Sequence, residues 1–318
     1  MAYEFVSVHE HLPDKTFYAI QAIMATGFVL AVTHAVRDRR RTGNPAAVIT
    51  LAGCFVYGLV VDITAYYTTD SFRHGNFTVM FLNDRLPLYI ALFYPAFMYP
   101  VVMTMRRFQL TPMVEAVGTG FYAAVTYLIF DNIGPLLHWW DWKPTNSFNK
   151  PFIDSVPLNS YQWFFLFTIA FAYVVRRVVW DRTRPWTPRS MTLTVATIPV
   201  LTYLGGAVLF IPADILLALE AYTANAVLYA IALAAAGYVL LIRRGPVRAE
   251  ADPVLMLFPL IWVIGLLLIY AATWHLWREA LVDDVAGRPS GNLFAVAAGM
   301  AISVAITCTA HPRSESAP

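Results

Sequence analysis

Apolar runs of about 20 residues recur along the chain between residues 16 and 310, separated by short polar stretches. Each run is long enough to cross the roughly 30 Å hydrocarbon core of a bilayer as a helix. The pattern predicts an all-α fold, a polytopic transmembrane helix bundle of about nine spans that forms one integral membrane domain over residues 1–318. The expected spans lie near 16–36, 45–67, 86–105, 112–138, 157–178, 190–212, 214–242, 253–277 and 290–310.

Composition strengthens this prediction. The chain is 58% hydrophobic and only 13% charged, with a mean hydropathy of +0.57, which leaves no room for a soluble domain. No basic patch is interleaved with exposed aromatic residues, so we expect no nucleic-acid partner. The expected location is the membrane itself, as an integral protein of a bacterial cytoplasmic membrane.

Charge sets the expected orientation. Fifteen of the 22 Lys and Arg residues follow the first, third, fifth, seventh and ninth spans. By the positive-inside rule the N-terminus should face outward and the C-terminus the cytoplasm. The outer loops should then be 68–85, 139–156 and 278–289. The least marked boundary is the one between the sixth and seventh spans, near Pro212 and Ala213.

Four acidic residues fall inside predicted spans or at their edges, whereas most of the others should be solvated in loops. A carboxylate at membrane depth is costly, so each such residue suggests a functional site. For Asp214, beside Pro212, a helix N-cap is the better expectation. The cytoplasmic half should be apolar apart from its arginines, and the outer half should form a polar cup. The four acids are Asp62, Asp131, Asp214 and Glu220.

The stretch FDNIGPLLHWWDW, residues 130–142, places an acid next to a helix breaker and an aromatic cluster. Pro135 has no N–H, so the carbonyl group of Asp131 loses its helical partner and the helix should kink or end. A backbone carbonyl group without a hydrogen-bond partner is tolerated at membrane depth where it lines a cavity. Because apolar surroundings favour the neutral form of a carboxyl group, Asp131 could act as a general acid. The rings of Trp139, Trp140 and Trp142 could face a cationic intermediate, or serve as interfacial anchors.

Helical spacing groups these residues further. Asp62 and Tyr66 are four residues apart, and two other polar stripes follow in the fourth and fifth spans. The alternative is a purely structural role, in which such residues only join helices to one another by hydrogen bonds. The candidate site lies within about residues 55–230. The candidate catalytic residues are Asp131, Asp62 and Glu220, and the candidate substrate-binding residues are Tyr66, Tyr127, His138, Trp139, Asn159, Gln162 and Trp163.

Three stretches carry a resemblance to a known family. They are VVDITAYYTTDSF followed by LPLYIALFYPAFMYP, then FDNIGPLLHWWDW, and then VPLNSYQWFF, together spanning roughly residues 55 to 170. In them the chain resembles the membrane carotenoid-biosynthesis family that includes the carotenoid 1,2-hydratases and bisanhydrobacterioruberin hydratase. It differs in having Asp62 where that family usually has a glutamate, and RHGNFTVMF in place of a Gly- and Tyr-rich segment.

This resemblance implies water addition across a terminal double bond of a long polyene, with a lipophilic isoprenoid or polyene substrate and membrane lipid as the partners. Asp131 or Asp62 would donate the proton. No cofactor or metal is expected, and the histidines lack the clustered spacing of a di-iron oxygenase. The partner carboxylate with Asn159 and Gln162 would hold the water, and Tyr66, Trp163 and Trp139 would line the cation.

Other functions fit the same pattern. A membrane terpenoid cyclase would use the same acid and aromatic walls but exclude water. A proton-coupled transporter would use the intramembrane carboxylates as a relay, although the chain shows no inverted repeat and no paired broken spans. A non-catalytic lipid-binding or assembly subunit is the remaining class. The sequence leaves the oligomeric state open.

Overall fold

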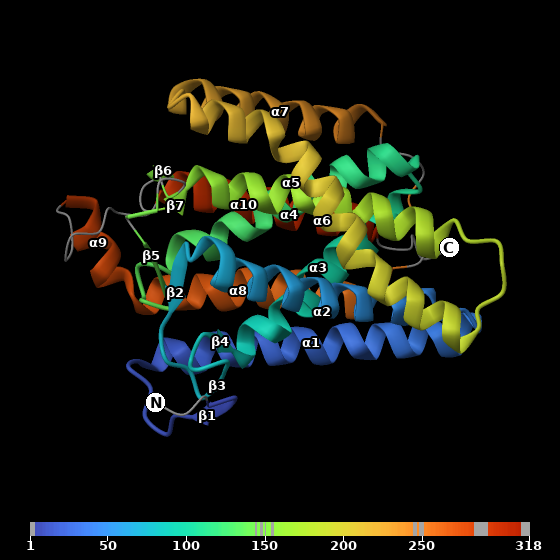
Figure 1. The fold of residues 1–318 in the computed structure, drawn as a ribbon, viewed down its shortest axis with the longest axis horizontal. Coiled ribbons are helices and arrows are strands. Elements are labelled where there is room, and N and C mark those ends of the chain that lie inside the picture. The colour runs from blue at the N-terminus through green and yellow to red at the C-terminus, as the bar shows by residue number, and fades with distance from the viewer. Residues whose placement is uncertain are drawn as a thin grey trace, which may run out of the picture.

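The computed structural model describes residues 4–143, 145–146, 149, 151–153, 156–243, 247, 251–282 and 292–312. Over these residues nine helices are long and apolar enough to cross a membrane, which confirms the helix bundle and its nine spans (Figure 1). The chain is thus an integral membrane protein. The long helices are α1 (Lys15–Thr42), α2 (Ala46–Thr64), α3 (Leu88–Met105), α4 (Pro112–Ile133), α5 (Leu158–Val175), α6 (Pro188–Ala218), α7 (Tyr222–Arg243), α8 (Pro253–Ala272) and α10 (Leu293–Ala310).

The core of the bundle is built around α3. Almost every side chain of α3 is buried, whereas α6 and α7 leave most of theirs exposed. The exposed faces of α6 and α7 carry large apolar side chains such as Leu204 and Ile231, which suits contact with lipid tails. Short helical turns extend α2 over Ala65–Thr69, α3 over Arg106–Phe108 and α5 over Arg176–Trp180.

Short strands gather with the small helix α9 (Trp274–Val282) at one end of the molecule, and α10 ends at the opposite end (Figure 1). The all-α prediction did not include these strands. Each is only two or three residues long, too short for a local periodicity to reveal it, and the β1–β3 and β2–β5 pairs join segments far apart in the sequence. The sheets are β1 (Val6–Val8) with β3 (Val79–Phe81) and β4 (Leu86–Pro87), β2 (Phe72–His74) with β5 (Trp140–Trp142), and β6 (Pro151–Ile153) with β7 (Val156–Pro157).

Proline affects the helix boundaries in two different ways. The helix α4 ends at Ile133, just before Pro135, as predicted. The predicted break near Pro212 and Ala213 is wrong, because Pro212 lies inside α6, which continues to Ala218. The N-cap role predicted for Asp214 is therefore also wrong. A membrane helix tolerates an internal proline where its neighbours compensate for the lost hydrogen bond.

The predicted span 253–277 is divided at Thr273, where α8 gives way to α9. Most of the predicted outer loop 278–289 lies outside the described residues. Two of the helices begin with an aspartate cap. Asp14 accepts a hydrogen bond from the backbone N–H of Thr16 at 2.6 Å, and Asp252 caps α8 in the same way.

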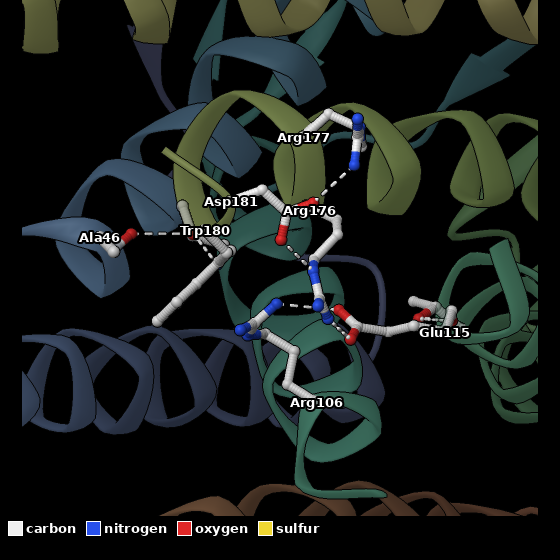
Figure 2. Close-up of polar contacts among 9 residues, drawn as sticks. Ala46, Arg106, Glu115, Arg176, Arg177, Trp180 and Asp181 are labelled. Atoms are coloured by element: carbon white, nitrogen blue, oxygen red, sulfur yellow. Dashed lines mark hydrogen bonds and ion pairs between the residues drawn. The ribbon is translucent and has the colours of Figure 1, made fainter. Parts of the chain in front are cut away.

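At the end of the molecule opposite the strands, Glu115 is buried between two arginines (Figure 2). Its carboxylate contacts Nη1 of Arg106 at 3.0 Å and Nη1 of Arg176 at 2.5 Å. Arg176 also donates through Nε to Asp181 at 2.7 Å. The half expected to be almost purely apolar apart from its arginines thus also contains a buried acid, because an ion-pair network joins α3, α4 and α5 there.

Candidate functional site, an aromatic cavity

A cavity of about 330 Å³ lies among the ends of α2, α5 and α6 that face the strands, with α3, α4, β2 and β5 completing its wall. Most of its lining is aromatic or aliphatic. A few polar side chains interrupt that lining, as in sites for lipophilic ligands. The polar and aromatic residues of the lining include Asp62, His74, Tyr94, Tyr127, Trp140, Trp142, Asn159, Ser160, Trp163, Phe164 and Asp214.

Asp62 lies in the last turn of α2 and lines the cavity directly. Its Oδ1 accepts a hydrogen bond from the hydroxyl group of Tyr94 at 3.3 Å. Its Oδ2 is buried and has no hydrogen-bond partner within the part of the chain that the structure describes. Gly58 makes this contact possible, since a Cβ at that position would lie 2.3 Å from the Tyr94 ring. Asp62 is therefore a buried carboxyl group with one free oxygen next to an aromatic cavity.

Asp131 lies in the last turns of α4, fully buried behind the cavity wall. It accepts hydrogen bonds from the hydroxyl of Tyr127 at 3.2 Å and from that of Ser160 at 2.7 Å. Both donors line the cavity, and the ring of Tyr127 stacks on Phe164 with centroids 3.4 Å apart. Asp131 thus reaches the cavity through two hydroxyl groups and does not line it.

Strands β2 and β5 close the cavity with His74, Trp140 and Trp142. His74 is buried, and burial lowers the pKa of its imidazole to about 3, so the ring is neutral near pH 7. Its Nδ1 lies 3.3 Å from the hydroxyl of Tyr89 and 3.3 Å from the carbonyl oxygen of Trp139. His74 therefore contributes a neutral hydrogen-bonding ring to the cavity wall.

Of the candidates drawn from the sequence, Asp62, Tyr127, Asn159 and Trp163 line the cavity. The carbonyl oxygen of the Asn159 side chain is buried and has no partner among the described residues, so it can accept a hydrogen bond from a ligand or a water. Asp214 lines the cavity too, from within α6. Polar and aromatic residues from α2, α4, α5 and α6, which are distant in sequence, therefore meet at one cavity.

The remaining candidates lie elsewhere. The indole of Trp139 is fully buried and donates to Thr16 at 3.2 Å, away from the cavity lining. Gln162 donates to Asn225 on α7 at 2.7 Å, and so joins two helices. Tyr66 lines a neighbouring charged pocket.

His138 and Glu220 are exposed, each in a tight turn with positive φ. His138 lies in the loop before β5, with its Nδ1 3.7 Å from Oδ1 of Asp141, and Glu220 lies between α6 and α7. Neither contributes to the cavity lining. The candidate catalytic residue Glu220 therefore lies outside the cavity, because α6 continues past Pro212 to Ala218 and Glu220 falls in the turn that follows.

Sequence reasoning missed His74, Tyr94 and Ser160. Tyr94 and Ser160 lie inside LPLYIALFYPAFMYP and VPLNSYQWFF, so the stretches were identified but not these side chains. His74 approaches through the pairing of β2 with β5, which no sequence period indicates. Within the described residues no group of three or more His, Cys, Asp or Glu side chains could hold a metal ion.

The chain belongs to the family described as a domain of unknown function (DUF7802), whose family model matches residues 7–251. The match includes every residue that lines the cavity and ends before α8. No curated protein and no solved structure matches the chain.

Proposed function

We propose that this protein is a membrane-embedded enzyme that protonates a carbon–carbon double bond of a lipophilic isoprenoid or polyene, in a hydratase-like reaction. The observation that carries the proposal is the free Oδ2 of Asp62 beside an aromatic cavity. Alkene protonation needs a carboxylic acid, an apolar slot and walls that tolerate a cation, and the cavity has all three features.

In this mechanism Asp62 is the general acid. An isolated charge in apolar surroundings is costly, so the resting residue is taken as the neutral acid. It transfers its proton to one carbon of the double bond, whose π electrons form the new C–H bond, and a carbocation and a carboxylate result. Water then attacks the cation and returns one proton to the Asp62 carboxylate. The net change is addition of one water to the alkene.

The surrounding side chains have separate roles. The rings of Trp163 and Phe164 line the cavity and face the cation. Asn159 offers its unpartnered side-chain oxygen to the attacking water. Asp131 acts through Tyr127 and Ser160, whose hydroxyl groups it orients, and is a positioning residue.

The orientation of the protein is part of the proposal. The arginine-rich end faces the cytoplasm and the cavity lies toward the outer face of a bacterial cytoplasmic membrane. A single cysteine placed at position 42, in a background lacking Cys54 and Cys308, should resist an impermeant thiol reagent on intact cells. Labelling at position 42 would show that the arginine-rich end faces outward, opposite to the proposed orientation.

Expression in a host that makes acyclic carotenoids, followed by mass analysis of the pigments in ¹⁸O-labelled water, tests the reaction. A hydrated product should carry the label in a new hydroxyl group. Asp62→Asn should lower product by roughly 100-fold or more, as losses of acid catalysis do. Asp131→Asn should lower it less and shift its pH profile, whereas Asp214→Asn serves as a cavity-lining control with a small effect.

Two outcomes would redirect the proposal. An unlabelled isomer of unchanged mass would show a cyclase, which uses the same acid but excludes water. Full activity of a folded Asp62→Asn variant would remove Asp62 from the mechanism.

A further inference from the structure

A second pocket, of about 370 Å³, adjoins the aromatic cavity and differs from it in chemistry. The two share Phe72 and His74, so they adjoin at strand β2. The second pocket is charged, with Arg73, Arg85 and Lys143 among its lining residues. We call it the charged pocket.

The charged pocket contains a buried group that lacks a partner. Tyr66 is 4% exposed, and its hydroxyl group has no hydrogen-bond partner in the described part of the chain. Tyr66 follows Asp62 by four residues, roughly 6 Å along a helix, so the two groups lie on the same face. A buried hydroxyl without a partner is uncommon, and here it can donate to a ligand.

The two acids of the charged pocket already have donors. Asp70 pairs with Lys143, and Asp84 accepts from Ser7 and from Nε2 of His9 at 3.2 Å. The Lys143 ammonium holds the pKa of Asp70 below its usual range, and the Ser7 hydroxyl does the same for Asp84. Both acids are therefore ionised and engaged near pH 7.

Two guanidinium groups remain. Arg85 donates to the carbonyl oxygen of Tyr66 at 3.1 Å and lies over the ring of Tyr67 at 5.3 Å, and Arg73 lies opposite Asp141 in the β2–β5 pair. Among the described residues neither arginine forms a direct ion pair with a carboxylate, although attraction to Arg73 helps to lower the pKa of Asp84 and attraction to Arg85 that of Asp70. Guanidinium groups are well suited to bind phosphate oxygens.

We propose that the charged pocket binds the phosphate or diphosphate head group of an amphiphile whose isoprenoid chain extends into the aromatic cavity. Arg73, Arg85 and the Tyr66 hydroxyl bind the head group, and the aromatic cavity takes the chain. The identity of the chain rests on the proposed function, but binding of the head group does not require the protonation step. The ligand that occupies both pockets is thereby an anionic isoprenoid amphiphile.

Isothermal titration calorimetry of the full chain in neutral detergent tests this, with farnesyl diphosphate, farnesol and inorganic pyrophosphate as probes. Farnesyl diphosphate should bind at least about tenfold more tightly than either of the others, since it alone fills both pockets. Its affinity should fall with added salt. The double variant Arg73→Gln/Arg85→Gln should lose roughly tenfold or more toward farnesyl diphosphate while farnesol binding stays unchanged.

Tyr66→Phe removes only one oxygen and should weaken farnesyl diphosphate severalfold. Arg278→Gln, on α9 and outside both pockets, is the matched control and should leave binding unchanged. Equal affinity for farnesyl diphosphate and farnesol, or no binding of any probe, overturns the proposal. Equal affinity for farnesyl diphosphate and pyrophosphate would show that the charged pocket binds a free anion, and would overturn the proposal that the ligand is an amphiphile. Binding as expected by a protein inactive on every alkene would overturn only the proposed function.

Discussion

Glu115 and Asp62 are both buried carboxyl groups in membrane-spanning helices, yet their surroundings differ in kind. Glu115, at the arginine end, has two arginines on its oxygens, and those arginines are held in turn by Asp181 and the ring of Trp180 (Figure 2). Asp62, at the other end, has one hydroxyl donor at 3.3 Å and one oxygen without a partner among the described residues.

This difference separates a structural acid from a candidate catalytic one. A buried charge whose hydrogen bonds are all satisfied fixes the arrangement of helices, because removing one partner leaves the other buried and unpaired, and it has no capacity left for a ligand. A buried carboxyl group with a free oxygen next to a cavity costs stability, and function is the reason such groups persist. Burial alone therefore does not identify the functional acid.

The largest effect should follow from removing the acid at the arginine end. Glu115→Gln leaves Arg106 and Arg176 without their shared carboxylate and should lower the free energy of unfolding by about 3–5 kcal/mol. Unfolding in detergent, followed by tryptophan fluorescence, measures it. Asp62→Asn should change stability by less than about 1 kcal/mol, because Asp62 has no cationic partner to leave behind.

Asp181→Asn provides the control for Glu115→Gln, because Asp181 is more exposed and pairs with the same Arg176. Its effect should stay within about 1 kcal/mol, as for other exposed pairs. Equal losses of unfolding free energy for Glu115→Gln and Asp62→Asn would show that the two acids do not differ in their structural role.

Hydropathy predicts the number of spans because every apolar run long enough to cross the bilayer forms a helix. It does not predict where a helix ends when the signal is a single proline. Pro135 and Pro212 look alike in sequence, but α4 ends just before Pro135 and α6 continues through Pro212. Tertiary packing decides between the two, and no local pattern contains that information.

The candidate site was predicted in part for a related reason. Depth in the membrane follows from sequence position, so Asp62, Asp214 and Asn159 could be assigned to one layer, and all three line the cavity. Lateral position does not follow from sequence. The sequence does not show which side of a helix faces its neighbours. In the structure Asp131 lies behind Tyr127, and Trp139 packs against Thr16.

A smaller effect is expected at the cavity end on acidification. His74 has a folded-state pKa of about 3, below the ordinary value of 6.5, so the unfolded chain binds more protons between those values. The contribution of His74 to stability is complete above pH 6.5 and is lost as the pH falls toward 3. At pH 5 the loss should be on the order of 2 kcal/mol.

His74→Gln keeps a neutral hydrogen-bonding group beside Tyr89 and should remove this part of the acid sensitivity. Unfolding curves of both proteins at pH 7 and pH 5 make the comparison, with the exposed His275 changed to Gln as control. An identical pH dependence in wild type and His74→Gln would show that His74 gains its proton without unfolding, contrary to its burial.

The smallest effects should come from the two tryptophans that distinguish the ends. Trp163 lines the cavity and stacks on Phe167 at 3.6 Å, whereas Trp180 donates to Thr50 at 3.1 Å and carries the guanidinium of Arg106 over its ring. Trp163→Leu keeps much of the apolar volume but removes the π-face, so it should lower the rate about threefold to tenfold with little change in stability. Trp180→Leu should instead lower stability by about 1–2 kcal/mol and leave the rate of the folded protein unchanged. Product formation and unfolding measured on the same two preparations separate these outcomes. If Trp163→Leu lowered the free energy of unfolding but left the rate of product formation unchanged, the rings of the aromatic cavity would only pack against one another, as Trp180 packs at the arginine end. They would then have no part in the reaction.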